Sequence, residues 1–161
     1  MWDRKYNLHA HLWQNKCTLL ALQIDFETLN LLPVLASDYP EVDMPMEGGL
    51  RITFTIRPEA IWDNGEPITA KDIEFTMKVI KNPKVDCARM RPYYEFIQDM
   101  EFYEDNPKKF SYICSEKYIL AVSASGDYPV LPRYAYDPKG LMNDFTIRQL
   151  KFILPLERFE I

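Results

Sequence analysis

The sequence contains few of the residues on which metal sites and nucleophilic catalysis depend. It has only two histidines, His9 and His11, and no cysteine or carboxylate stands at a metal-ligand spacing beside them. Two histidines near one end also offer no base for a distant serine or cysteine nucleophile, and the sequence has no nucleophile elbow and no glycine-rich phosphate loop. We therefore expect no metal, no cofactor, no catalytic residues and no enzymatic activity.

Long apolar runs and clustered basic residues are also missing. Lys and Arg number 19 against 24 Asp and Glu, so the net charge is −5, and no basic stripe favours a nucleic-acid partner. No apolar run approaches the roughly 18 residues that a membrane-spanning helix needs. The N-terminus lacks the charged and then apolar pattern of a signal sequence. The sequence predicts a soluble chain without a transmembrane segment.

Cysteines are too few for a disulfide framework. The three are Cys17, Cys87 and Cys114, an odd number at wide spacings. We expect buried free thiols, and a bridge between Cys87 and Cys114 is the alternative in an oxidising compartment.

The size and composition of the chain indicate one globular domain. It has 161 residues, of which 47% are hydrophobic and 27% charged, which is the ordinary balance of a folded protein. Twelve prolines against five glycines predict many rigid, irregular connections. These numbers favour an α+β domain with loops.

Residues 50–82 carry the clearest pattern in the chain. Apolar and polar side chains alternate strictly over residues 50–57, which is typical of a strand with one buried face. Residues 63–67 include Asn-Gly and a proline and predict a tight reversal. Thr69 and Asp72 match a capping box and predict a helix that ends at Asn82, before a proline. Two apolar stripes lie on that helix, one with Ile73, Met77 and Ile80 and the other with Phe75 and Val79.

Weaker patterns lie on both sides of this stretch. Residues 6–13 predict a short helix, and residues 20–32 predict a hairpin whose second strand begins at Thr28. A second hairpin is expected over residues 100–114, with Phe110, Tyr112 and Cys114 on one face.

Short helices are expected in the second half of the chain. One runs over residues 91–97, and another over residues 116–124, with Ser115 as its cap. Residues 145–161 begin with a β-like alternation of apolar side chains.

Residues 50–73 resemble the signature of the family 5 extracellular solute-binding proteins, the dipeptide- and oligopeptide-binding components of ABC importers. In that family a strand leads into an apolar residue, a Trp, Asp-Gly, a Pro and then Thr-Ala-x-Asp at the start of a helix. The matching residues are Ile52, Thr53, Phe54, Ile56, Arg57, Ile61, Trp62, Asp63, Gly65, Glu66, Pro67, Thr69, Ala70, Asp72 and Ile73.

A second block in the correct order strengthens the resemblance. Residues 19–36 match the family through Leu22, Asp25, Thr28, Pro33, Leu35 and Ala36. The chain also departs from the family pattern. Asn64 separates Asp63 from Gly65, and Tyr134 stands where a histidine is usual, so no role that needs an imidazole is carried over.

The resemblance implies an α+β fold with a small mixed, mainly antiparallel sheet and flanking helices. This would be part of the N-terminal lobe of a periplasmic-binding-protein type II-like fold. Residues 1–161 would form a single domain, a fragment of a larger two-lobed protein that is periplasmic or anchored to the cell envelope as a lipoprotein. Its two lobes would close over a peptide or another small solute, such as nickel, haem or an oligosaccharide, for delivery to a membrane permease.

The resemblance assigns no ligand-binding residue to this chain. It implies a structural role for the signature residues Trp62, Asp63, Gly65, Thr69 and Asp72. Two other classes of function stay open. The fold could serve as a protein-interaction module with exposed Tyr and Met clusters, or Asp63 and Glu66 could act as the acid and base of a small hydrolase.

Overall fold

The computed structural model describes residues 20–25, 27–44, 49–83, 85, 88–115 and 119–137. Several sequence-based expectations lie outside these residues: the helix over 6–13, both histidines, Cys17, Cys87 and the alternation over 145–161.

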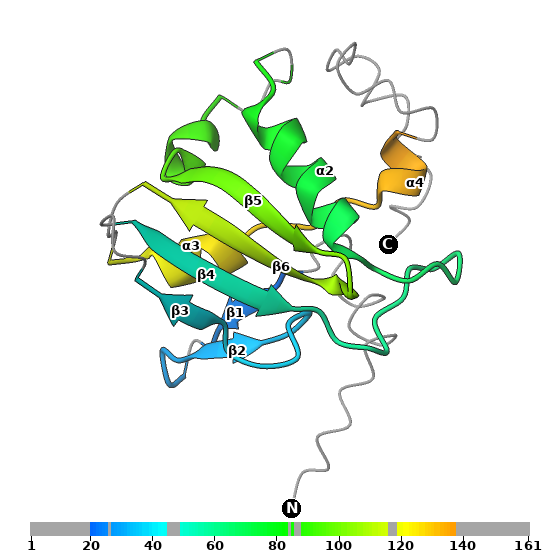
Figure 1. Ribbon diagram of the computed structural model, residues 1–161, viewed down its shortest axis with the longest axis horizontal. Coiled ribbons are helices and arrows are strands. Elements are labelled where there is room, and N and C mark those ends of the chain that lie inside the picture. The colour runs from blue at the N-terminus through cyan, green and yellow to red at the C-terminus, as the bar shows by residue number, and fades with distance from the viewer. Residues whose placement is uncertain are drawn as a thin grey trace, which may run out of the picture.

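A four-stranded antiparallel sheet forms the centre of the fold (Figure 1). Its strands, in spatial order, are β3 (Glu41–Asp43), β4 (Leu50–Thr55), β6 (Asn106–Cys114) and β5 (Ile97–Tyr103). β4 therefore has β3, which is close in sequence, on one side and β6, which follows more than fifty positions later, on the other. Its register with β6 runs from Leu50 opposite Cys114 to Thr55 opposite Lys109.

The strand expected over residues 50–57 is confirmed. Leu50, Ile52 and Phe54 are buried, and Ile56 extends the pattern through an isolated bridge to Ala36. The opposite face differs from expectation at Thr53, which is only 6% exposed. Its hydroxyl lies 2.7 Å from that of Ser111 on β6, so each of the two hydroxyls has a hydrogen-bond partner within the sheet.

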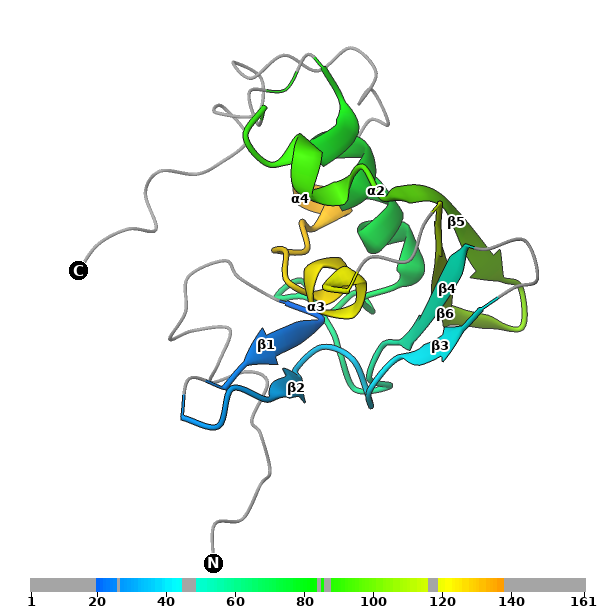
Figure 2. The same ribbon diagram turned by 90° about the vertical axis from the view of Figure 1, so that its left-hand side faces the viewer.

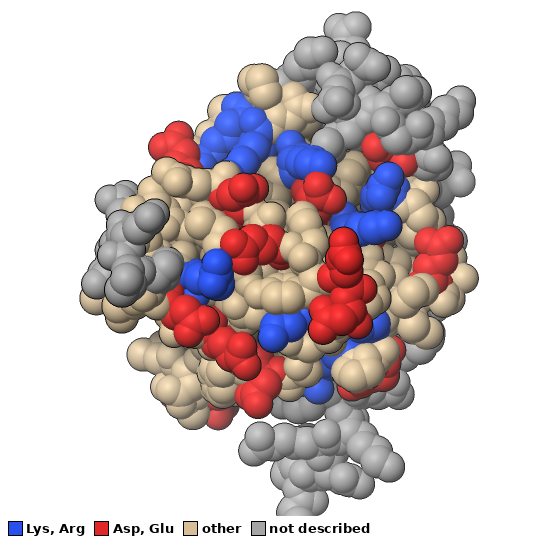
Figure 3. Space-filling model, in the orientation of Figure 1, with Lys and Arg blue, Asp and Glu red and all other residues tan. Residues whose placement is uncertain are grey.

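One face of the sheet is covered and the other is open. Figure 2 shows α2 (Ala70–Lys81), α3 (Ala121–Gly126) and the two-stranded sheet of β1 (Leu22–Ile24) and β2 (Leu31–Pro33) on the covered side. Figure 3 shows acidic and basic side chains interspersed on the open side. Arg51 and Glu101 pair across that face at 3.1 Å. An open face of this composition explains why the polar positions of β4 alternate with its core positions.

Helix α2 (Ala70–Lys81) covers the sheet with the two stripes that the sequence predicts. Ile73, Met77 and Ile80 join the main core, which also contains Phe54, Phe110 and Tyr112. Phe75 and Val79 form a separate small cluster with Val85. The helix therefore contacts two different parts of the protein.

The predicted N-terminal hairpin is present, but its turn is longer than expected. β1 (Leu22–Ile24) pairs with β2 (Leu31–Pro33). The second strand does not begin at Thr28, because the Asp25 carboxylate accepts hydrogen bonds from the Glu27 amide at 2.9 Å and the Thr28 hydroxyl at 2.7 Å. These bonds stabilise the turn that Asp25 forms with residues 27–30. The bond from the Thr28 hydroxyl, followed by that from the Glu27 amide, lowers the pKa of Asp25.

The second hairpin, β5 with β6, is confirmed, and the helices around it are shorter than expected. The 3-10 helix η1 (Arg91–Tyr94) ends before Ile97, which belongs to β5. Helix α3 (Ala121–Gly126) has Leu120 as its N-cap residue, so the prediction of a cap at Ser115 was wrong. A last short helix, α4 (Arg133–Tyr136), follows an extended segment.

Cys114 is a buried free thiol, so the alternative of a bridge to Cys87 was wrong. It ends β6 opposite Leu50 and is 1% exposed. Burial raises the pKa of Cys114 to about 11. The thiol therefore behaves as a small core side chain.

Candidate functional site

The signature residues gather around one tight turn and the start of α2. The Trp62 amide donates to the Glu66 carbonyl at 2.8 Å, and the Gly65 amide donates to the Trp62 carbonyl at 3.0 Å. Gly65 has φ +86°, a conformation that glycine adopts without strain. This backbone closure is the tight reversal that the sequence predicts.

Thr69 and Asp72 form the predicted capping box at the start of α2. The Asp72 Oδ2 accepts from the Thr69 amide at 2.9 Å and from the Thr69 hydroxyl at 3.4 Å. Asp72 is 7% exposed, so these bonds compensate the loss of water around its carboxylate. Its other oxygen, Oδ1, accepts from the Arg133 amide at 3.3 Å.

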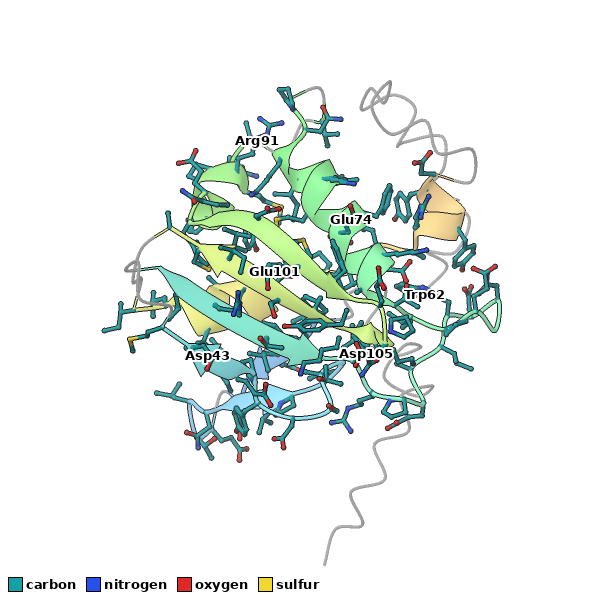
Figure 4. The ribbon with its side chains drawn as sticks, viewed as in Figure 1. Asp43, Trp62, Glu74, Arg91, Glu101 and Asp105 are labelled. Atoms are coloured by element: carbon teal, nitrogen blue, oxygen red, sulfur yellow. The ribbon has the colours of Figure 1, made fainter. Side chains whose placement is uncertain are left out.

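Tyr134 connects the signature turn to the C-terminal part of the described chain. Its hydroxyl donates to the Asp63 carboxylate, and its ring centroid lies 6.4 Å from that of Trp62. Figure 4 places Trp62 beside the start of α2. The indole ring is 8% exposed, and its N–H has no acceptor among the residues that the structure describes. The aromatic pair thus belongs to the packing between the turn and the segment around Tyr134.

Asp63 and Glu66 are the residues that the hydrolase alternative would use as acid and base. Both side chains lie on an exposed turn. Asp63 is engaged by Tyr134, and neither residue lines the groove described below. The geometry that this alternative requires, two carboxylates converging in a concave pocket, is not formed by these two residues.

A groove with a volume of about 470 Å³ runs between α2 and the edge strand β5. Its apolar lining includes Met77, Ile97, Met100 and Phe102. Phe102 is 45% exposed and lies on β5, the edge strand of the sheet.

Charged groups on the rim of the groove are engaged by other protein groups. Lys78 pairs with Glu74 on the same helix, and the Lys81 ammonium donates to the Ile97 carbonyl. Asp99 accepts from the Met100 amide at 2.8 Å. Burial lowers the pKa of Lys81, and the nearby Asp99 carboxylate opposes that shift. The rim therefore carries two basic and two acidic side chains, each of which is engaged within the protein.

The tyrosines that could have formed a docking face differ widely in exposure. Tyr94 and Tyr112 are buried, and Tyr103 bonds Ser111 at 2.9 Å beside the sheet. Tyr93 is 70% exposed, and Tyr118 lies outside the described residues. Tyr93 is thus the one exposed member among the four described tyrosines of this set, which do not gather as an exposed docking face.

Two basic side chains that sequence reasoning missed hold the entry to the signature turn. Lys108 donates to the carbonyls of Arg57, Pro58 and Ala60 at 2.9, 2.8 and 3.1 Å. Arg57 donates to the Val34 and Pro33 carbonyls at 2.7 and 3.1 Å. All five acceptors are backbone carbonyls distant in sequence, so no side-chain pattern predicts these bonds.

Thr76 is a third missed residue, and here the sequence carried a signal. Its hydroxyl accepts from the Leu131 amide at 2.9 Å and donates to the Asp72 carbonyl at 2.7 Å. The helical period places Thr76 near the core stripe of Ile73 and Ile80, and a buried polar group there requires a partner.

Metal binding and membrane insertion find no support in the described part of the chain. No group of three or more His, Cys, Asp or Glu side chains among the described residues is arranged to hold a metal ion. Within the same residues, no helix combines the length and the apolar character needed to span a bilayer.

The fold is α+β, built mainly from antiparallel strands, and it matches peptide-binding proteins of the periplasmic-binding-protein type II-like class. The oligopeptide-binding protein of Thermus thermophilus, solved with a pentapeptide, superposes with a TM-score of 0.60 at 22% identity. The match covers 77% of this chain and 21% of that protein. At this identity the likeness establishes the fold alone.

Residues 30–136 match the family described as bacterial extracellular solute-binding proteins, family 5 Middle. The chain therefore belongs to this family of extracellular and periplasmic solute-binding proteins, as its signature predicts. It is 40% identical over 57 residues to the dipeptide-binding protein DppE of Bacillus subtilis, covering 35% of this chain and 10% of that protein. It is 27% identical over 88 residues to the peptidoglycan-binding protein YepA of Agrobacterium fabrum, covering 55% of this chain and 14% of that protein.

Proposed function

We propose that this chain is part of the substrate-binding component of an ABC importer for peptides. The observation that carries the proposal is the family match over residues 30–136, which contains the complete signature turn and capped helix. The chain spans 10% and 14% of the two curated relatives, so the activity proposed here belongs to a larger protein.

In this proposal residues 1–161 are one domain from the N-terminal region of a two-lobed parent. The lobes of the parent close over the ligand, and a membrane permease receives the closed form. DppE is named as a dipeptide binder, and the Thermus protein was solved with a pentapeptide, which supports a peptide ligand. The parent would lie in the periplasm or be anchored to the envelope as a lipoprotein.

The signature residues have a structural role in this proposal and make no contact with the ligand. Trp62 and Gly65 close the turn by backbone bonds, Thr69 and Asp72 cap α2, and Asp63 accepts from Tyr134. Each is therefore engaged within the chain. The family binds solutes and does not catalyse reactions, which supports a non-enzymatic role.

The test compares the purified parent protein with the 161-residue chain by calorimetry, using peptides of two to nine residues. We expect the parent to bind at least one length and the isolated chain to bind none measurably, because one wall cannot enclose a ligand. Antibodies raised against the chain should detect a product several times larger than 19.0 kDa in the cell envelope. A cytosolic product of about that mass, without peptide affinity, would contradict the proposal and favour the interaction module.

A further inference from the structure

Residues 131–137, which we call the strap, lie along α2 and are held there by side chains of the helix. The Leu131 amide donates to Thr76 at 2.9 Å, and the Arg133 amide donates to Asp72 at 3.3 Å. Pro132 lies between them with an extended backbone, φ −71° and ψ 107°, and has no amide hydrogen to satisfy.

The spacing of the two strap amides matches the spacing of their acceptors on α2. Alternate amides of an extended segment point to the same side about 6.6 Å apart. Residues 72 and 76 stand one turn apart on the helix, with a rise of about 6 Å. An aspartate and a threonine at these positions therefore accept both amides of the strap from one face of α2.

Further contacts hold the strap along its length. The Tyr134 hydroxyl donates to Asp63, so the signature turn also contributes an acceptor. Leu131 and Tyr136 pack on the small cluster of Phe75, Val79 and Val85, which is separate from the main core. No residue of α4, the helical part of the strap, is buried. Tyr134 packs against the main core and, like Leu131 and Tyr136, is only partly buried. Asp137, the last residue of the strap, is 6% exposed. The strap is therefore attached to the fold mainly through apolar side chains that stay partly exposed.

We propose that the strap opens and closes on α2 as one unit, and that Asp72 and Thr76 are positioning residues that set its closed population. Segments with few buried apolar contacts open at lower free energy than the core to which they attach. The proposed opening concerns the described chain alone and does not depend on the proposed function.

Amide hydrogen exchange of the 161-residue chain, followed by NMR at increasing urea, tests the proposal. Within the strap the amides of Ala135, Tyr136 and Asp137 bond carbonyls of Pro132 and Arg133. We expect these three amides and that of Leu131 to share one opening free energy with a small urea dependence. The amides of β4 and β6 should instead follow global unfolding, with a large urea dependence.

The decisive variant is Thr76→Val, which keeps the shape of the side chain and removes the acceptor for Leu131. It should accelerate exchange at the amides of Leu131, Ala135, Tyr136 and Asp137 by a common factor of roughly ten. The reason is that the Leu131 amide would lose its acceptor in the closed state, which lowers the stability of that state. Thr76→Ser restores the hydroxyl and should return the rates to near the original values. Should Thr76→Val fold poorly, Tyr134→Phe removes the bond to Asp63 and should accelerate the same amides.

Thr53→Val is the matched control, because Thr53 is also a buried threonine with a hydroxyl partner. It should lower the protection of core amides and leave the strap amides unchanged. The proposal would be overturned if Thr76→Val accelerated exchange at the Leu131 amide alone. It would also be overturned if the strap amides showed the same large urea dependence as the core amides. Peptide binding does not enter this measurement, so its result is independent of the proposed function.

Discussion

Gly65 is a residue at which backbone conformation alone decides the preferred side chain. It has φ +86°, and a Cβ built there would meet no atom within 4 Å. We expect Gly65→Ala to lower the free energy of unfolding by about 1 kcal/mol through backbone strain, measured by urea denaturation. Gly65→Asn should cost less, because asparagine tolerates positive φ. Equal losses for both variants would show that the strain argument is wrong.

The signature cluster shows what residue-level patterns can predict. Thr69 and Asp72 are three positions apart, and local spacing was sufficient to predict their capping box. Tyr134 is far from Asp63 in the sequence, and nothing in the tyrosine itself indicates that it bonds a turn aspartate. Local geometry is encoded by neighbouring residues, whereas this contact depends on where the later segment packs.

At the scale of elements, Arg57 joins the N-terminal hairpin to the main sheet. Its guanidinium donates to the Val34 and Pro33 carbonyls, and its amide donates to the Leu35 carbonyl at 3.0 Å. We expect Arg57→Met to lower the free energy of unfolding by roughly 1–3 kcal/mol, because two carbonyls lose a charged donor. Thermal and urea unfolding measure this loss.

Arg51→Met is the control for this prediction. Arg51 forms an ion pair with Glu101 on the open face, with side-chain exposures of 37% and 46%. Solvent screens this pair, so its removal should cost less than about 1 kcal/mol. If both methionine variants lost the same stability, Arg57 would not connect the two sheets in the way described.

Elements with strong local patterns could be predicted, and the pairing between them could not. Alternation predicted β4 and the second hairpin, and the helical period predicted both stripes of α2. The pairing of β4 with β6 is set by the shared core, because no short turn connects these strands. Ser115 appeared to be a helix cap, but its amide donates to the Phe96 carbonyl and continues the sheet.

At the scale of the whole molecule, buried tyrosines make stability depend on alkaline pH. The Tyr112 and Tyr128 hydroxyls are hydrogen-bonded to each other in the interior, and burial raises the pKa of both. Burial also raises the pKa of Tyr94. Above pH 10 the unfolded chain releases these protons and the folded chain keeps them. The stability that depends on these tyrosines should therefore be full below pH 10 and fall above it, by up to about 1.4 kcal/mol per pH unit for each tyrosine.

Other groups act in the same pH range. Cys114, with its pKa raised to about 11, adds to the loss. Burial lowers the pKa of Lys81 and Lys108, so these two groups oppose the loss of stability at alkaline pH. Urea unfolding at several pH values measures the slope. Tyr128→Phe should reduce stability at neutral pH and flatten the decline above pH 10, and an unchanged slope would show that Tyr128 is not responsible.

The position of β6 between β4 and β5 also determines when the protein can fold during synthesis. Phe54 of β4 stacks on Phe110 of β6, with ring centroids 5.6 Å apart. A ribosome that has reached Tyr103 has produced β3, β4, α2 and β5, but the strand that joins β4 to β5 has not yet been made. Until Cys114 emerges, the hydrophobic strand β4 has β3 on one edge and no partner on the other, and this interval is when a chaperone has an apolar segment to bind.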